Sequence, residues 1–169
     1  LDTSLTGPNS KVKLTTGQFN SIGSTYGYKD ANVMKRLQKE HLDNDTNKIP
    51  MLFMENVVHG YRTIYPVTLA LGASFDTKLM EECCAMAAKE AAVGGVHVTF
   101  APMVDLVRDA RWGRCMESTG EDVYLNSIMA RAQVRGFQNG NEDKRYNLAA
   151  CVKHFAAYGA AEAGRDYNT

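Results

Sequence analysis

The chain has 169 residues, and its 19 Lys and Arg side chains balance 19 Asp and Glu side chains, so its formal net charge is zero. This length fits one domain or part of a larger one, and a hydrophobic share of 44% excludes a disordered chain. We expect neither nucleic acid nor a membrane as a partner, because the first needs a basic face and no apolar run approaches the roughly 20 residues that cross a bilayer.

Hydrophobic periodicity predicts helices and strands in alternation. Residues 1–28 are rich in Gly, Ser, Thr and Asn and are expected to be mostly irregular. After them we expect, in chain order, a helix over 31–42, a strand over 49–54, a helix that Asp76 caps and that ends at Val93, a strand over 96–101, a helix over 123–137 and a strand over 148–152. Strands that alternate with helices of this length indicate βαβ units and a parallel sheet, which is an α/β fold.

The irregular length of the chain is concentrated after the strands. Segments 55–75 and 102–122 follow the first two strands, whereas the return from helix to strand at Gly94 and Gly95 is minimal. In parallel α/β sheets and barrels, sites are built from the loops beyond the carboxyl ends of the strands. We therefore expect the functional residues in these loops.

Each of these loops carries groups that donate hydrogen bonds. Asn56 follows the first strand, Arg114 lies in the second loop, and Lys153 and His154 directly follow the third strand. A single Lys or Arg after a strand is usually solvated or salt-bridged, so the inference depends on the agreement of three loops. Amide, cationic and imidazole groups gathered at one edge of a sheet suit a hydroxyl-rich or anionic ligand.

Motifs in these loops resemble those of the family-three glycoside hydrolases, and the resemblance covers residues 30–169. The motifs are IPMLF and VVHGYRT within 49–63, RWGRCMESTGED in 111–122, KHFAAYG in 153–159 and GRDYNT in 164–169, the last being most similar to the bacterial periplasmic β-glucosidase branch. The resemblance implies that residues 1–169 are a partial N-terminal catalytic domain, the first part of a (β/α)8 TIM-like barrel truncated after about three strands. In the family, the rest of the barrel and an α/β sandwich domain follow.

The resemblance also implies an activity and the residues that serve it. Family members hydrolyse β-linked glucosides, sometimes xylosides, from the non-reducing end with retention of configuration and without a metal or organic cofactor. Carried over by motif, Arg114, Lys153 and His154 bind hydroxyls of the terminal sugar of a β-glucoside or oligosaccharide. Such bonds strengthen in the transition state and supply several kcal/mol. A periplasmic or extracellular location is implied as well.

Two departures from the family pattern bear on activity. The family usually has an Asp where this chain has Asn56, and an amide forms weaker hydrogen bonds than an ionised carboxylate. Glu55 is adjacent, but neighbours on an extended chain point to opposite sides, so we do not expect it to substitute. The family's Asp nucleophile and its acid/base lie later in the barrel, and neither falls within residues 1–169. We therefore assign no catalytic residue to this chain, expect the 169-residue piece alone to be inactive, and keep a non-catalytic carbohydrate-binding relative as the alternative.

Three further side chains in the loops have a plainer interpretation. We expect Glu117 to pair with a nearby Arg and Glu121 to favour a helix N-terminus, rather than the two forming a catalytic pair. Trp112 can line a sugar site or pack in a loop, and both interpretations stay open.

A lyase that uses Lys153 to form a Schiff base is a third candidate function, which the adjacent His154 and the motifs disfavour.

The remaining titratable residues are expected to be structural. His59 and His97 are interpreted as structural and His41 as solvated. The four cysteines lack the CxxC spacing of zinc and redox sites, so we expect reduced thiols packed as small apolar side chains, with one disulfide left open. The chain has neither an initiator Met nor a signal peptide, so we expect it to begin inside a longer product.

Overall fold

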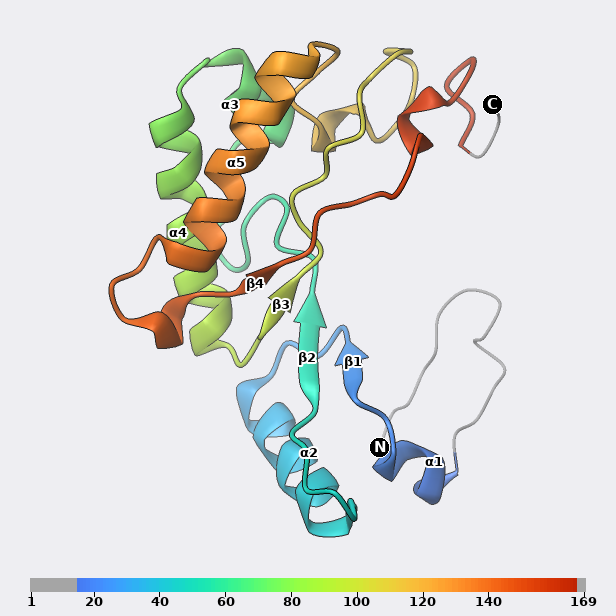
Figure 1. Ribbon diagram of the computed structural model, residues 1–169, viewed down its shortest axis with the longest axis vertical. Helices are drawn as coiled ribbons and strands as arrows, with labels where there is room; N and C mark the ends of the chain where they lie inside the picture. The colour runs from blue at the N-terminus through green and yellow to red at the C-terminus, as the bar shows by residue number, and fades with distance from the viewer. Residues whose placement is uncertain (1–14, 167–169) are drawn as a thin grey trace.

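The computed structural model describes residues 15–166, and within them the chain forms an α/β fold around a parallel sheet (Figure 1). In this part of the chain the sheet has four strands in the spatial order β1-β2-β3-β4, which is also their order in the sequence. The strands are β1 (Ser24–Tyr26), β2 (Leu52–Glu55), β3 (Val98–Thr99) and β4 (Ala149–Ala150). Every neighbouring pair is parallel, with Tyr26 opposite Met54, Glu55 opposite Thr99, and Thr99 opposite Ala150. The carboxyl ends of the strands therefore meet at one edge.

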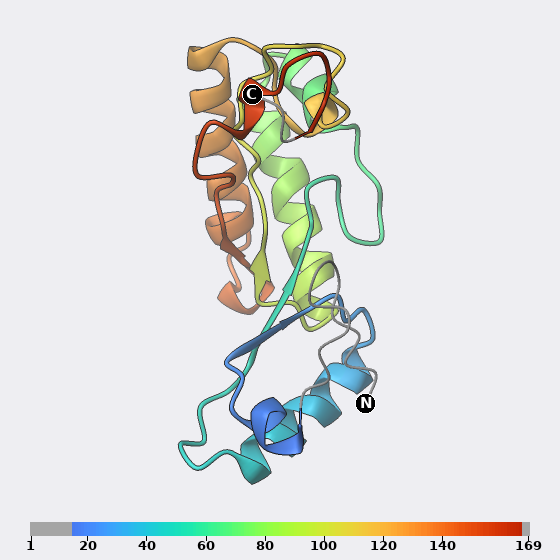
Figure 2. The ribbon, with the colours of Figure 1, turned by 90° about the vertical axis from the view of Figure 1, so that its right-hand side faces the viewer.

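Helices connect the strands, and their bounds are α1 (Thr16–Asn20), α2 (Ala31–Asn44), α3 (Thr68–Ala73), α4 (Thr77–Val93) and α5 (Val123–Asn139), with the short 3-10 helices η2 (Cys115–Glu117), η3 (Lys144–Tyr146) and η4 (Tyr158–Ala160). In Figures 1 and 2, α4 and α5 run side by side, while α1 and α2 lie at the opposite end of the molecule. The long segments after β3 and β4 extend to the end where α3 and the start of α5 lie.

An aspartate caps each of the helices α2, α4 and α5. The Oδ1 atoms of Asp30 and Asp76 each accept two backbone N–H groups of the first turn, at 2.8 to 3.1 Å, and Asp122 accepts one at 2.6 Å. Such a cap is worth about 1 kcal/mol, because it satisfies N–H groups that have no partner inside the helix. The predicted cap at Asp76 is confirmed.

The main core lies between these helices and the sheet. It joins side chains of β2 with the facing sides of α4 and α5, and its fully buried members include Leu37, Met51, Met80, Ala88, Met129 and Phe137. The core fixes the helices against the strands and thereby sets the direction in which each strand delivers its loop.

Gly136 allows α5 to approach α4 closely. A Cβ atom at this position would lie 2.4 Å from the Glu81 carbonyl oxygen and 2.6 Å from the Cys84 Cβ, both of which belong to α4. We predict that Gly136→Ala lowers the free energy of unfolding by about 1–3 kcal/mol, because overpacking outweighs the better helix propensity of Ala. Urea denaturation measures this change. Gly23→Ala is the matched control, since nothing lies within 4 Å of a Cβ there; equal stability of the two variants would contradict the prediction.

Most of the predicted elements are confirmed. The predicted helices over 31–42, 76–93 and 123–137 correspond to α2, α4 and α5, and the predicted strands over 49–54, 96–101 and 148–152 overlap β2, β3 and β4. The observed strands are shorter because only the paired residues count as strand, whereas apolar patterns continue into the loops. Helix α3, inside the long segment after β2, was not predicted.

The prediction for the N-terminal region is wrong where it can be compared. Residues 1–14 lie outside the described residues, but α1 and β1 occupy much of the remainder that was expected to be irregular. Strand β1 also makes the sheet four strands wide within residues 15–166, not about three. A three-residue strand is too short for a periodic signal, and this one is held by pairing with β2: the Leu52 N–H donates to the Gly23 carbonyl at 2.9 Å.

Two side chains depart from what was expected of them. His41 is buried rather than solvated, with its Nε2 atom 2.9 Å from the Ile49 carbonyl oxygen. All four cysteines fall within the described residues and are free; Cys84 is buried as expected, but Cys151 is exposed.

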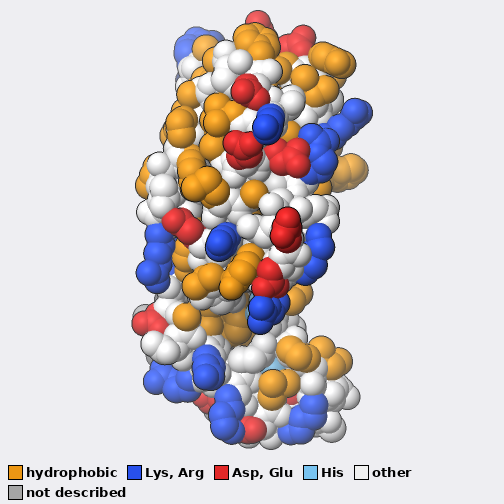
Figure 3. Space-filling view, turned by 90° about the vertical axis from the view of Figure 1, so that its left-hand side faces the viewer, with side chains coloured by type: hydrophobic (Ala, Val, Ile, Leu, Met, Phe, Trp, Pro, Cys, Tyr) orange, Lys and Arg blue, Asp and Glu red, His pale blue; other side chains and the backbone are white. Residues whose placement is uncertain are grey.

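The surface agrees with the balanced composition. On the face in Figure 3, Lys and Arg side chains are interspersed with Asp and Glu side chains rather than gathered into one patch. No helix within residues 15–166 combines the length and the hydrophobicity that a bilayer span requires.

Candidate functional site

The side chains singled out from the sequence lie beyond the carboxyl ends of the strands. Asn56 directly follows β2, and Lys153 lies three residues beyond Ala150, the last residue of β4, where it forms an isolated bridge with Met103. Arg114 comes from the long segment after β3. The parallel sheet thus delivers one loop from each strand to the same edge, as the α/β pattern predicts.

Lys153 connects two of these loops. Its Nζ atom donates to the Asn56 Oδ1 at 3.1 Å and lies 3.7 Å from the Glu117 Oε2, and only 12% of its side chain is exposed. Burial lowers the pKa of Lys153, and the nearby Glu117 carboxylate works in the opposite direction. The Asn56 Nδ2 donates in turn to the Tyr26 hydroxyl at 2.9 Å. The amide is therefore held from both sides.

Arg114 and Glu117 form a two-point ion pair. The Arg114 Nε and Nη2 atoms donate to the two carboxylate oxygens of Glu117 at 2.7 and 2.8 Å. Burial acts to raise the pKa of Glu117, but the hydrogen bond and charge of Arg114 and the charge of Lys153 outweigh it, so this pKa lies below its usual value. The expectation that Glu117 pairs with an Arg is confirmed. Glu117 is an ionised acceptor that orders two cations.

His154 is held by a buried carboxylate that sequence reasoning did not assign. The Asp105 Oδ2 accepts the His154 backbone N–H at 3.1 Å and lies 2.7 Å from its Nδ1, and the Asp105 side chain is 3% exposed. Because a carboxylate only accepts, the proton sits on Nδ1 and Nε2 is the nitrogen turned from Asp105. No local pattern could reveal this pair, since the two residues stand 49 positions apart.

A third group of residues, also missed from the sequence, lies behind Arg114 and His154. The Tyr158 ring contacts both, and Asp166 links Tyr158 to the indole of Trp112. Trp112 is 1% exposed, which settles its open interpretation in favour of packing. Thus Asn56, Arg114, Lys153 and His154 are brought together, either in direct contact or through Glu117 and Tyr158.

The other residues considered from the sequence were not assigned to sugar binding. The His97 Nδ1 accepts the Phe53 backbone N–H at 3.1 Å, which is a structural role. His59 is half-buried, and burial lowers its pKa. Glu55 is buried, and its Oε1 accepts the backbone N–H of Asn56 at 2.8 Å. Within residues 15–166, no three His, Cys, Asp or Glu side chains gather as metal ligands.

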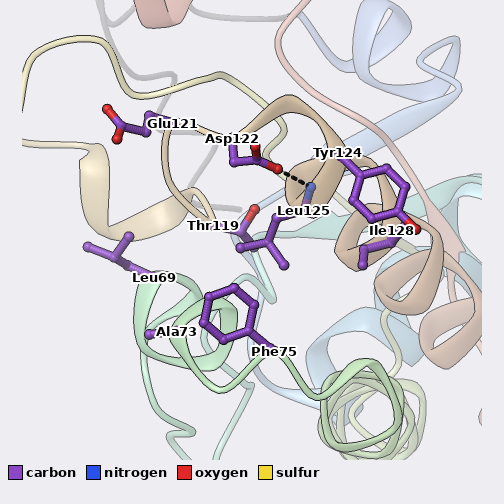
Figure 4. Close-up of a pocket in the computed structure, with 9 residues that line it drawn as sticks. All are labelled: Leu69, Ala73, Phe75, Thr119, Glu121, Asp122, Tyr124, Leu125 and Ile128. Atoms are coloured by element: carbon purple, nitrogen blue, oxygen red, sulfur yellow. Dashed lines mark hydrogen bonds between the residues drawn. The ribbon is translucent and has the colours of Figure 1, made fainter.

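A separate hollow lies between α3 and the start of α5 (Figure 4). Its walls are mostly apolar and include Phe75, Tyr124 and Ile128, with Glu121 and Asp122 at one side. Asp122 caps α5 there, as the dashed line to Leu125 shows. Since Glu117 pairs with Arg114 whereas Glu121 lines this hollow, the two carboxylates serve different places and do not form a catalytic pair.

Comparisons with known proteins point to one family. The family model of the Glycosyl hydrolase family 3 N terminal domain matches residues 11–169. A periplasmic β-glucosidase of Salmonella typhimurium is 42% identical over 153 residues, which cover 90% of this chain and 20% of that protein. A putative β-xylosidase of Formosa agariphila is 36% identical over 138 residues, which cover 78% of this chain and 18% of that protein.

Solved structures show the same likeness. The β-glucosidase of Listeria innocua in complex with isofagomine superposes with a TM-score of 0.91 at 50% identity, covering 98% of this chain and 24% of that one. Other structures of that enzyme contain glucose or, in a variant, laminaribiose. The chain spans about a fifth of the length of these relatives.

Proposed function

Because this chain belongs to glycosyl hydrolase family 3, we propose that it is the first part of the N-terminal barrel of a longer retaining β-glucosidase. On this proposal, residues 1–169 supply sugar-binding side chains, while the remaining strands, the nucleophile, the acid/base and an α/β sandwich domain belong to sequence beyond them. The relatives' greater length supports this division. The isolated piece is expected to be inactive, because retention needs two carboxyl groups about 5–5.5 Å apart at the scissile bond.

The observation that carries the proposal is the network that joins three loops at one edge of the sheet. Lys153 contacts Asn56 and Glu117, and Glu117 holds Arg114. Charged donors fixed in advance can bind vicinal hydroxyls of a sugar without reorganising during the reaction. His154, oriented by Asp105, adds an imidazole to the same edge.

The work of these residues is binding and orientation. Lys153 and Arg114 donate to hydroxyls of the terminal sugar, and the Glu117 carboxylate balances their charges so that they can lie together while half-buried. His154 offers its Nε2, and Asn56 can both donate and accept. Bonds of this kind hold the anomeric carbon in place and strengthen as the ring flattens in the transition state.

The proposed substrate is a non-reducing terminal β-D-glucosyl residue, and a xylosyl residue is the second choice. Glucose, laminaribiose and isofagomine are the ligands of the Listeria innocua enzyme, and the Formosa agariphila relative is named as a putative β-xylosidase. The name of the Salmonella typhimurium relative supports a periplasmic or extracellular location.

A non-catalytic carbohydrate-binding protein of the same fold is the second candidate. It is favoured by Asn56, which stands where the family usually has an Asp and whose Oδ1 and Nδ2 already bond Lys153 and Tyr26. Hydrolysis of a chromogenic β-glucoside by the full-length protein decides between the two candidates. Turnover supports the enzyme, whereas sugar binding without turnover supports the binding protein. The intact mass under denaturing conditions shows whether the tested sample is the piece of 18.6 kDa or a longer product.

We predict that Asn56→Asp raises the activity of the full-length protein on β-glucosides. A carboxylate accepts charge-assisted hydrogen bonds that are roughly twice as strong as those of a neutral amide, and Lys153 lies 3.1 Å away to balance its charge. The expected gain in kcat/KM is about tenfold, measured on a chromogenic β-glucoside. Asn47→Asp, at an exposed position in the turn after α2, is the matched control. No gain at position 56 would mean that the site is adapted to the amide.

A further inference from the structure

We propose that Tyr158 and Asp166 are positioning residues that hold Arg114 and His154 in their sugar-binding orientations. The inference rests on the function proposed above and assigns a role to two residues outside the set carried over from the family motifs. Neither residue is proposed to touch the sugar. They act through the side chains that do.

The Tyr158 ring packs against both Arg114 and His154. The Arg114 guanidinium lies over the ring with its Cζ 5.3 Å from the ring centre, and the His154 ring meets it edge to face at 4.7 Å. The first is cation–π geometry and the second is the favoured arrangement of aromatic pairs. Glu117 fixes one side of Arg114 and Asp105 fixes one side of His154, so Tyr158 restricts the remaining freedom of each.

Asp166 determines how the Tyr158 hydroxyl points. The Asp166 Oδ2 accepts the Tyr158 hydroxyl at 2.9 Å, and its Oδ1 accepts the Trp112 Nε1–H at 2.6 Å. The hydrogen bonds of Trp112 and then Tyr158 hold the pKa of Asp166 below its usual value, so it is a carboxylate that only accepts. The hydroxyl proton is therefore directed to Asp166, and the oxygen presents a lone pair to the Arg114 Nη1 at 3.5 Å.

The backbone around Tyr158 and Asp166 lies too close to the preceding loop for larger residues. A Cβ at Gly159 would lie 2.3 Å from the Leu106 carbonyl oxygen, and one at Gly164 would lie 2.6 Å from the Arg111 carbonyl oxygen. Segment 158–166 therefore packs against segment 105–112 at two points. Because Trp112 belongs to the same loop as Arg114, Asp166 ties the segment after β4 to the loop that carries a sugar-binding cation.

The test uses the full-length protein with four variants, Tyr158→Phe, Tyr158→Leu, Asp166→Asn and the control Glu162→Gln. The first keeps the ring and loses the hydroxyl, and the second loses the ring. Asp166→Asn keeps the shape but places an amide opposite two donors. The control makes the same carboxylate-to-amide change at an exposed position of the same segment. kcat and KM on a chromogenic β-glucoside, the inhibition constant of glucose and the melting temperature are measured for each.

We expect Tyr158→Leu to lower kcat/KM about 100-fold and Asp166→Asn about tenfold, because small misplacements of positioned groups cost this much. Tyr158→Phe, which keeps the ring, should retain most of the kcat/KM that Tyr158→Leu loses. Inhibition by glucose should weaken in each variant in parallel with its kcat/KM. Glu162→Gln should match the wild type in both. If the variants at positions 158 and 166 melt at lower temperatures but keep the wild-type kcat/KM and glucose inhibition, Tyr158 and Asp166 only stabilise the packing of the two loops. This result would overturn the inference. If Tyr158→Leu does not fold, Asp166→Asn, which preserves shape, decides by comparison with Glu162→Gln. An inactive wild type that does not bind glucose would overturn the proposed function together with the inference, whereas an active wild type with normal variants overturns the inference alone.

Discussion

Replacing Lys153 with alanine is expected to lower kcat/KM of the full-length protein on a chromogenic β-glucoside at least about 100-fold. Lys153 links the three loops, because its ammonium group contacts both Asn56 and Glu117. Only 12% of its side chain is exposed. On the proposed function, its removal takes a charge-assisted donor from the sugar, and hydrogen bonds to charged groups are worth about 1.5–3 kcal/mol each. It also leaves the Asn56 Oδ1 without its Lys153 donor.

Lys144→Ala is the control for the loss of a lysine, because Lys144 lies exposed in η3, away from this edge. It should leave kcat/KM unchanged. Lys153→Arg is a second comparison: it keeps the charge but brings a planar, larger head that does not fit between the Asn56 amide and the Glu117 carboxylate, so it should restore little activity. Near-normal turnover of Lys153→Ala would refute the assignment of Lys153 to the sugar.

Replacing Arg114 with alanine is expected to cause a similar loss, again about 100-fold or more in kcat/KM. The guanidinium makes two parallel bonds to Glu117 and lies over the Tyr158 ring, so its orientation is fixed before a sugar arrives. A preorganised donor is the kind of group whose loss falls on the transition state. Arg114→Lys should not restore activity, because lysine cannot form the two-point contact with the carboxylate.

The loss at Arg114 has a second component that can be separated. Without Arg114, Glu117 loses its two-point partner and keeps the Lys153 ammonium at 3.7 Å. Adding Glu117→Gln to Arg114→Ala should therefore recover part of any lost stability but none of the lost turnover. Arg135→Ala, which removes an exposed ion pair with Glu81, is the control and should be nearly silent in both measurements. Turnover that survives in Arg114→Ala would remove Arg114 from the site.

The long helices and the edge of the site could be predicted because their signals are local. Asp76 and Val93 bound α4 by a cap and a following glycine pair, and Asn56, Lys153 and His154 follow shortly after apolar strands. In a parallel sheet, residues that follow the strands lie together at one edge of the sheet. The meeting of Asn56 with Lys153, 97 positions apart, follows from that rule.

The parts that could not be predicted depend on partners far away in the chain. Strand β1 is three residues long and is defined by its pairing with β2. Asp105 and Asp166 are ordinary loop carboxylates in the sequence, and only the fold places one on His154 and the other between Trp112 and Tyr158. Sequence motifs therefore identify the residues proposed to contact a ligand more readily than the residues, such as Asp166, that position them.

The central claim is that Arg114, Lys153 and His154 bind the terminal sugar at the carboxyl edge of the sheet. A crystal structure of the full-length protein with glucose tests it most directly. We predict a glucose whose hydroxyls lie within about 3.2 Å of the Lys153 Nζ, the Arg114 guanidinium and the His154 imidazole, with Tyr158 and Asp166 placed as in the present structure. A glucose bound elsewhere, or one that leaves these three side chains without a sugar contact, would contradict the claim.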